Sequence, residues 1–195
     1  MHPLTTRYKE ICLPKLTESH QYSSTYLIPR VSKVSVNCGI GDVMTNGKAV
    51  DEVVKLLASI TGQKPAEAKA RNAISGFKIR KDQVVGLKTT LRGGRMNDFL
   101  FKLIEIALPR TRDFRGLKPS AVTEDGSLNI GIRDSTIFPE AAELEGTGHG
   151  LQVTVVSNAR SKDEARLLYE SLGFVFGSAE DTATKKKGRK SSYKR

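Results

Sequence analysis

The residues best able to act as nucleophiles, general bases or metal ligands are two cysteines and three histidines, at Cys12, Cys38, His2, His20 and His149. None of the histidines has a partner at the spacing of a metal site, and the cysteines lack the paired spacing of a zinc site. We therefore expect surface imidazoles in loops, reduced thiols, and no metal or other cofactor.

Three glutamates, Glu140, Glu143 and Glu145, lie close together in a stretch that resembles a loop. Such a cluster more often carries solvated charge than a general acid and base. The sequence spacing brings no nucleophile, base and orienting group together. The chain is therefore not expected to be an enzyme.

A second candidate is the glycine pair of Gly39-Ile40-Gly41, which follows a predicted strand and precedes a predicted helix. Backbone amides in such a turn can approach a phosphate at a helix N-terminus. The passage has neither the third glycine of a dinucleotide fingerprint nor the Gly-Lys-Ser/Thr ending of a phosphate loop. A nucleotide-dependent enzyme therefore stays an alternative, behind a simple turn or a contact with an RNA backbone.

The strongest signal is a basic loop around Gly76 and Phe77, flanked by Lys78, Arg80 and Lys81. It combines backbone freedom, a ring that can stack on a base or sugar, and cations for phosphate. A large aromatic side chain is costly to leave in water, so Phe77 should pack on the sheet or on a partner. We interpret this loop as a surface for structured RNA.

The charge of the chain supports a polyanionic partner. The formal net charge is +11 and the pI is near 9.7, which points to nucleic acid or an anionic membrane surface. Nine basic and two acidic residues lie between 63 and 95, and seven basic and no acidic residues lie between 185 and 195. The sequence has no apolar run of transmembrane length and no apolar signal segment, so we expect a soluble, unexported protein.

The elements that must position these residues begin with a helix over 8–13, which Pro14 should stop. Alternating apolar residues predict a half-buried strand over 31–36, followed by a glycine turn over 37–42. Apolar residues at three- and four-residue steps then predict a helix over 47–61.

Two further strands should run from Glu67 to about Ile74 and over 84–91, joined by the long exposed cationic loop 75–83. The next helix is expected over about 95–108, because Pro109 should lie just past its end. Together these segments predict a basic hairpin that leads into a helix.

Later strands are expected around 128–132 and 151–156, and a last helix should begin at Ser161 with a capping box and end at Gly173. Strands and helices without a regular alternation favour an α+β domain with a largely antiparallel sheet and helices packed on one face. We assign 1–176 to a single domain with an N-terminal helical arm, and 177–195 to a disordered basic tail.

Several ordered blocks resemble a known family, the large-subunit ribosomal protein L five of the bacterial and organellar type. The resemblance covers about residues 7–176. It rests on Val36-Asn37-Cys38-Gly39-Ile40-Gly41, Ile60-Thr61-Gly62-Gln63-Lys64-Pro65, Ala73-Ile74-Ser75-Gly76-Phe77-Lys78-Ile79-Arg80, Thr90-Leu91-Arg92-Gly93, the run from Ala107 to Leu117, Ile137-Phe138-Pro139-Glu140 and Asp163-Glu164-Ala165-Arg166-Leu167-Leu168.

The resemblance implies a structural, non-enzymatic RNA-binding protein of the central protuberance of the large subunit, with a ribosome in the bacterial cytoplasm or an organelle as its location. The implied partners are 5S rRNA, large-subunit rRNA, the peptidyl-site tRNA, a small-subunit head protein at an intersubunit bridge, and neighbouring proteins of the protuberance. No membrane partner is implied.

Carried over by motif, the positions that the family uses against 5S rRNA are Asn37, Gly39, Gln63, Thr90, Leu91 and Arg92. The positions that match the tRNA-facing loop are Ser75, Gly76, Phe77, Lys78 and Arg80. The rival hypotheses are the nucleotide-binding enzyme with the Gly39–Gly41 turn, and a membrane-surface protein or non-specific RNA chaperone that binds by charge alone.

Overall fold

The computed structural model describes residues 2–19, 22–41, 47–77, 79–112, 114–142 and 148–177. In these residues, one antiparallel sheet has the strand order β2-β3-β1-β5-β4. The strands are β1 (Val31–Gly39), β2 (Ala66–Lys69), β3 (Val84–Leu91), β4 (Leu128–Ile132) and β5 (Leu151–Ser157). The α+β class and the antiparallel sheet predicted from the sequence are confirmed.

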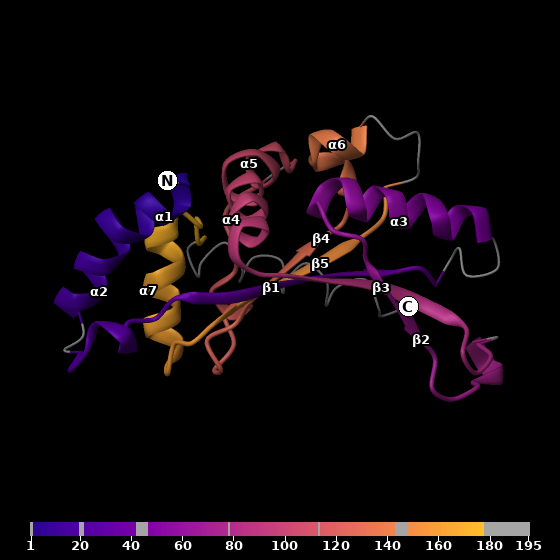
Figure 1. Ribbon diagram of the computed structural model, residues 1–195, viewed down its shortest axis with the longest axis horizontal. Helices are drawn as coiled ribbons and strands as arrows, with labels where there is room; N and C mark the ends of the chain where they lie inside the picture. The colour runs from indigo at the N-terminus through magenta and orange to yellow at the C-terminus, as the bar shows by residue number, and fades with distance from the viewer. Residues whose placement is uncertain are drawn as a thin grey trace, which may run out of the picture.

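The helices of the described residues are α1 (Pro3–Arg7), α2 (Leu13–Ser19), α3 (Gly47–Thr61), α4 (Gly93–Lys102), α5 (Leu108–Arg110), α6 (Pro139–Ala142) and α7 (Lys162–Leu172). Figure 1 shows α3, α4, α5 and α6 on one side of the sheet, with α1, α2 and α7 gathered at one end. None of these helices combines the length and the apolar character that crossing a membrane requires.

The core lies between the sheet and the helices. On β1 the side chains of Val34, Val36 and Cys38 are completely buried, while the residues between them are half-buried or exposed. Successive side chains of a strand point to opposite faces, so one face of the sheet joins the core and the other stays open. Buried residues from both halves of the chain belong to one connected cluster.

Two prolines lie inside helices, which corrects the predicted helix ends at Pro14 and Pro109. The π-helical turn Tyr8–Cys12 joins α1 to α2, and a second π-helical turn, Leu103–Ala107, joins α4 to α5. In each case the residue before the proline donates its N–H to a carbonyl five residues back, Leu13 to Tyr8 and Leu108 to Leu103. A proline ring clashes with the carbonyl four residues back in an ordinary helix; the wider turn relieves this clash, so the chain stays helical.

Two strand boundaries also differ from the predictions. The first strand continues through Asn37 to Gly39, because its pairing with β3 and β5 extends that far. The strand expected to reach Ile74 ends at Lys69, where the register with β3 shifts. Three other predictions agree with the structure in both bounds: the helix over 47–61 and the strands over 84–91 and 128–132.

The N-terminal helical arm packs on α7 and α4 through specific polar bonds. Arg7 Nη1 donates to Glu105 Oε1 at 2.7 Å and to the Leu172 carbonyl, the last of α7, at 3.1 Å. His2 is not a free surface imidazole as expected, because its Nδ1 accepts from the Leu4 N–H and its Nε2 lies 3.1 Å from Asp98 Oδ1. These contacts hold the arm against two distant segments.

The buried carboxylate of Glu164 fixes the start of α7. Its Oε1 accepts from the Tyr22 hydroxyl at 2.6 Å, and its Oε2 accepts from the Arg160 N–H at 2.7 Å. Burial, and the bond to this carboxylate, raise the pKa of the Tyr22 hydroxyl above its usual range. The capping box is thus modified: Ser161 accepts from the Glu164 N–H as predicted, but the glutamate reaches back to Arg160.

The end of the described chain is tied to the segment after α5. The Leu117 N–H donates to the Val175 carbonyl at 2.7 Å, and the Gly177 N–H donates to the Leu117 carbonyl at 2.9 Å. Gly116 has φ +95°, and a Cβ there would lie 2.5 Å from the Gly177 nitrogen. The predicted basic tail lies, from residue 178 on, outside the described residues, and the division between domain and tail stays a prediction.

We predict that Gly116→Ala lowers the free energy of unfolding by about 1–3 kcal/mol, because it adds a side chain at a positive φ against backbone atoms that cannot rotate away. Urea denaturation measures the change. The control is Gly94→Ala in α4, where a Cβ meets no atom within 4 Å, so stability should rise by a few tenths to about 1 kcal/mol. Equal effects of both substitutions would contradict this explanation.

Both cysteines are free and buried. Burial raises the pKa of the Cys12 thiol to about 11, above an ordinary value near 9. A raised pKa in the folded state means that this thiol supports stability below pH 9, and that its contribution is lost as the pH rises from about 9 to about 11.

We therefore expect the free energy of unfolding to fall more steeply between pH 9 and pH 11 in the parent chain than in Cys12→Ala. Urea denaturation at several pH values gives both slopes, and comparing slopes removes the packing loss of the substitution. Identical slopes would show that Cys12 ionises equally easily in the folded and unfolded chain.

Candidate nucleic-acid interface

The open face of the sheet is a flat polar surface built from three neighbouring strands. Ser35 at the centre of β1 pairs with Thr90 on β3 and with Thr154 on β5. Two residues along, Asn37 pairs with Lys88 and Gln152 in the same way, and Asn37 and both of its partners are exposed. We call these six residues the polar face: Ser35, Asn37, Lys88, Thr90, Gln152 and Thr154.

The polar face continues onto β4. Thr154 Oγ1 donates to Asn129 Oδ1 at 2.7 Å, and Asn129 pairs with Thr154 across the strands. This bond uses the amide oxygen of Asn129, so the amide N–H groups stay available as donors. The surface therefore presents hydroxyls, amides and one ammonium group, which are donors and acceptors for ribose, base edges and phosphate.

The predicted 5S-contact residues lie at or beside this face, with one exception. Asn37 and Thr90 are diagonal neighbours across β1 and β3, a position in which residues lie about 7–8 Å apart and long polar side chains can reach the same ligand. Gly39 follows at the exposed end of β1, opposite Gly86. Leu91 is the exception, because its side chain is fully buried opposite Val34 and belongs to the core.

Gln63 connects the end of α3 to the end of β3. Its Nε2 donates to the Thr90 carbonyl at 3.4 Å, and its Oε1 accepts from Arg95 Nη1 at 3.4 Å. Arg92 is exposed and extended at the start of α4. Gln63, Thr90, Arg92 and Arg95 therefore lie together at one end of the polar face, where they place two guanidinium groups.

Nothing in the described residues would prevent a side chain at Gly39. A Cβ built there meets no atom within 4 Å, and its φ lies outside the positive range. A position without a side chain, at the exposed end of a strand, lets another backbone approach closely. The absence of an internal reason is consistent with a reason outside the chain.

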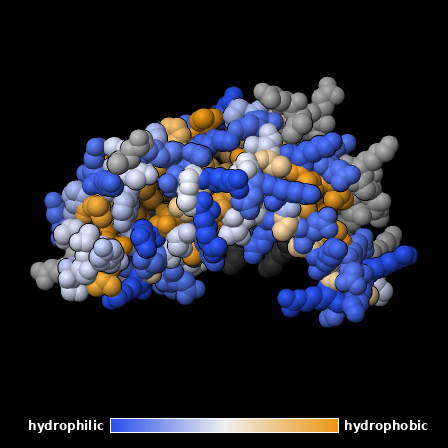
Figure 2. Space-filling view, viewed as in Figure 1, coloured by the Kyte–Doolittle hydropathy of each residue, from blue (hydrophilic) through white to orange (hydrophobic). Residues whose placement is uncertain are grey.

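The loop between β2 and β3 projects from the sheet and closes on itself through backbone bonds. The N–H of Ala70 donates to the Gln83 carbonyl at 2.8 Å, and Ile74 and Ile79 exchange bonds of 2.9 and 3.1 Å. Asp82 has φ +64°, and the Gln83 side chain accepts from the Arg80 N–H at 2.9 Å. Figure 1 shows this loop at the far end from α1, and Figure 2 shows that hydrophilic residues cover most of it.

The tip of the loop is the 3₁₀ turn Ser75–Phe77. Phe77 is 73% exposed and Ile74 is 47% exposed, so Phe77 does not pack on the sheet, and its contact with a partner stays a prediction. Ser75, Gly76 and Arg80 are exposed beside it. Lys78 lies outside the described residues. The residues predicted to contact tRNA therefore lie in the loop between β2 and β3, and none of them belongs to the polar face.

Glu140 is the one glutamate of the predicted cluster that lies within the described residues, and it makes a structural contact. Glu140 pairs with Lys102, whose Nζ also donates to the Ile60 carbonyl, and so links α6, α4 and α3. Gly39 lies in a strand and not in a phosphate-binding turn. Glu143, Glu145 and His20 lie outside the described residues. Among those described, no group of three His, Cys, Asp or Glu side chains could hold a metal ion.

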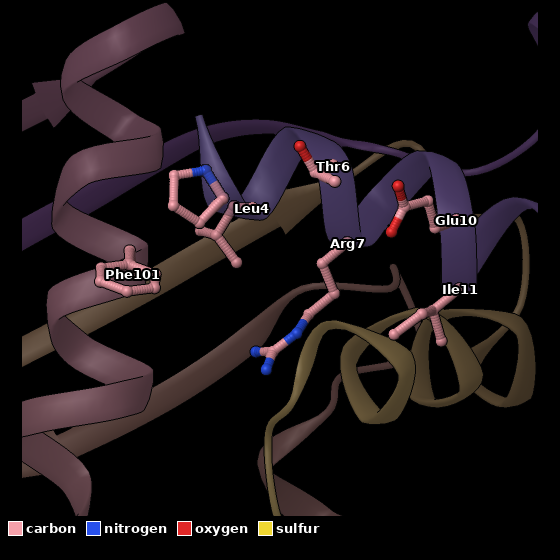
Figure 3. Close-up of a pocket in the computed structure, with 7 residues that line it drawn as sticks. Leu4, Thr6, Arg7, Glu10, Ile11 and Phe101 are labelled. Carbon is pink, nitrogen blue, oxygen red and sulfur yellow. The ribbon is translucent and has the colours of Figure 1, made fainter. Parts of the chain in front are cut away.

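One hollow of about 360 Å³ lies between the N-terminal arm and α4, and is drawn in Figure 3. Arg7 points from the arm toward the neighbouring helices, with Phe101 on α4 at the far side. The guanidinium is already bonded to Glu105 and to the Leu172 carbonyl. The hollow is therefore a packing gap around a structural ion pair.

The alternation of β5 could have identified Gln152 and Thr154 from the sequence, because each lies between apolar residues of a predicted strand. On β3, Lys88 lies three residues before the apolar Leu91, so alternation places the two on opposite faces. The same alternation would also have placed Leu91 in the core, since adjacent residues of a strand cannot face the same side. Arg95 had no such signal, because its contact with Gln63 depends on how α3 and α4 meet.

Comparisons with known proteins match most of the chain. The family model described as ribosomal protein L5 matches residues 24–80, and the model for the C-terminus of the same ribosomal family matches 84–176. Large ribosomal subunit protein uL5 of Syntrophomonas wolfei is 45% identical over 177 residues, which cover 90% of this chain and 99% of the relative. The Synechocystis protein of the same name is 43% identical over 90% of the chain and 98% of the relative. The protein uL5c of Spinacia oleracea is 41% identical over 97% of the chain and 75% of the relative.

Proposed function

Because the chain belongs to the ribosomal protein L5 family, we propose that it attaches 5S rRNA to the large ribosomal subunit through the polar face and touches peptidyl-site tRNA through the 74–83 loop. Membership makes the chain a structural constituent of the large ribosomal subunit, with ribosomal RNA as its partner. Its relatives are bacterial and chloroplast proteins, so its place is a ribosome of the bacterial cytoplasm or of an organelle. The related proteins are structural and not enzymes.

The observation that carries the 5S proposal is the open polar face with its basic end. A-form RNA presents a wide, shallow minor groove lined by 2′-hydroxyls, which suits a flat surface of hydroxyl and amide groups. The polar face offers such groups on three strands, and Arg92 and Arg95 add phosphate-binding cations at its end. Gly39 leaves room for an RNA backbone at the other end of β1.

Within this site the predicted residues take different roles. Asn37, Thr90 and Arg92 offer side chains to the RNA. Gln63 has both amide ends bonded within the protein, so it positions the Thr90 carbonyl and Arg95. Leu91 contributes through the core, because its burial opposite Val34 fixes the direction in which Thr90 and Arg92 point.

We predict that Arg92→Ala weakens 5S rRNA binding by roughly 1–3 kcal/mol, because it removes a charge-assisted bond to a phosphate. A filter-binding or fluorescence titration with 5S rRNA measures this loss. The control Lys55→Ala removes an exposed cation of α3, which lies on the helix-covered side of the sheet, and should weaken binding much less. An unchanged affinity of Arg92→Ala would remove Arg92 from the site.

The tRNA proposal rests on the exposed aromatic residue at the tip of a projecting, internally bonded loop. Phe77 on the 3₁₀ turn offers a ring face for stacking, and exposed Arg80 and Lys81 lie on the returning side. The pairs Ala70–Gln83 and Ile74–Ile79 hold the loop in a defined shape without help from RNA. The loop can therefore reach a ligand that the sheet does not touch.

We expect Phe77→Ala to leave 5S affinity unchanged and to weaken tRNA retention at the peptidyl site of reconstituted ribosomes by about 1–3 kcal/mol, the usual value of one stacking contact. Dissociation rates of labelled tRNA give the readout. Phe77→Tyr keeps the ring and serves as the matched control. If Phe77→Ala reduced 5S binding, the division between polar face and loop would be wrong.

The remaining partners are proposals without assigned residues. They are large-subunit rRNA beside the 5S site, a small-subunit head protein at an intersubunit bridge, and neighbouring proteins of the central protuberance. The resemblance of the chain to its family supports them.

A further inference from the structure

The outermost strand β4 completes a row of polar side chains that crosses the open face of the sheet. β4 lies at the edge of the sheet, next to β5 (Figure 1). Four polar residues, one on each of four strands, lie opposite one another in the strand register, and we call them the cross-strand row: Thr90, Ser35, Thr154 and Asn129. Neighbouring strands are about 4.7–4.9 Å apart, so the row spans about 14 Å.

The core fixes the side of the sheet on which the last two members of the row lie. Leu128 and Ile130, on either side of Asn129, are buried, so alternation along β4 turns Asn129 to the open face. Thr154 lies in the same way between Val153 and Val155, which are completely buried. A β-branched threonine also has few side-chain rotamers. The Thr154 hydroxyl therefore has little choice of position.

The Thr154 hydroxyl orients the amide of Asn129. Thr154 Oγ1 donates to Asn129 Oδ1 at 2.7 Å. An amide without this bond could turn over and exchange its oxygen with its NH2 group. The bond keeps the oxygen next to β5, so the NH2 group lies on the other side of the amide carbon. Within the part of the chain that the structure describes, this NH2 group has no hydrogen bond.

The surface beside Asn129 is open to a ligand. Gly131 is the next residue of β4 on the same face, because residues two apart in a strand share a face. It is exposed, and a Cβ built there would meet no atom within 4 Å. Its partner across the strands is Gln152, a member of the polar face. A nucleic-acid backbone can therefore approach the Asn129 amide along β4.

The chemistry of the cross-strand row favours ribose over phosphate and over base edges. The row has three hydroxyls and one amide and carries no charge, whereas phosphate is bound most strongly by cations. The wide, shallow minor groove of A-form RNA displays 2′-hydroxyls, and double-stranded RNA is recognised there mostly by shape and by 2′-hydroxyl and phosphate contacts. A side chain as short as asparagine, on a flat sheet, reaches the riboses at the rim of the groove before the bases at its floor.

We propose that Asn129 is a further 5S-contact residue, whose NH2 group donates to a ribose 2′-oxygen, and that Thr154 is a positioning residue that orients this amide. The inference rests on the proposed function for the identity of the RNA. It extends the RNA site across the sheet to β4, and it gives the chain a means of distinguishing RNA from a nucleic acid that lacks 2′-hydroxyls.

The test compares 5S rRNA with the same sequence made from 2′-fluoro nucleotides throughout. The fluorinated RNA keeps the A-form helix, but fluorine bonded to carbon accepts hydrogen bonds poorly. The proteins are the full chain, Asn129→Ala, Thr154→Val, the double variant of these two, and Thr154→Ser, which keeps the hydroxyl. The matched control is Asn72→Ala, which removes an exposed amide from the loop between β2 and β3. Fluorescence titration at one salt concentration gives both affinities of each protein.

We expect Asn129→Ala to weaken 5S rRNA binding about two- to tenfold, the range of one hydrogen bond, and to leave the affinity for the fluorinated RNA nearly unchanged. The ratio of the two affinities should therefore fall by the same factor. Thr154→Val should lower the ratio by a smaller factor, and Thr154→Ser should keep it. The double variant should lose no more than Asn129→Ala alone, because Thr154 acts through Asn129. Asn72→Ala should change neither affinity.

Three outcomes would overturn the proposal. If Asn129→Ala weakened binding of both RNAs equally, the amide would support the fold or contact a base edge, and not a ribose. If the losses of Asn129→Ala and Thr154→Val added up in the double variant, Thr154 would contact the RNA itself. If Asn72→Ala lowered the ratio as much as Asn129→Ala, the effect would not belong to β4. Failure of the proposed function would look different, because the unsubstituted chain would then bind a structured RNA of the same size as tightly as 5S rRNA.

Discussion

The structure depends on the central strand β1, which pairs with a neighbour on both sides. Val34, Val36 and Cys38 point into the core and are fully buried, so the residues between them must point outward. A shift of one residue in the pairing would exchange the two sets and would bury Asn37 while exposing three apolar side chains. The same hydrophobic burial that stabilises the sheet therefore also fixes which polar groups lie on the open face.

The helices cover the core face of the sheet and leave its open face uncovered. Both long helical segments pass through a proline by way of a π-helical turn, and the first of them is fastened by Arg7 to Glu105 and to the end of α7. The buried Glu164 receives bonds from both Tyr22 and Arg160, which joins the N-terminal region to the start of α7. These bonds assemble the N-terminal arm and α7 on the core without using the polar face.

The sequence predicted the elements whose signals are local. The helix over 47–61 and the strand over 84–91 have periodic apolar residues. The glycines that follow α3 and α7, Gly62 and Gly173, have positive φ values and end these helices. The helices that contain Pro14 and Pro109 were cut short, because a π-helical turn depends on a carbonyl five residues back that no local rule indicates. Among the site residues, Asn37 and Thr90 were predicted together, but their diagonal position needed the strand register, and the Gln63–Arg95 contact needed the meeting of two helices.

The central claim is that a specific surface, and not charge alone, selects the RNA partner. The most direct measurement is a titration of the purified chain against 5S rRNA and against a structured RNA of the same size, repeated at several salt concentrations. The shape and hydrogen-bonding groups of the polar face should make 5S rRNA bind tighter by orders of magnitude at physiological salt, with a preference that persists as salt rises. Equal affinities that fall together with salt would contradict the account and would leave a basic protein that binds any RNA.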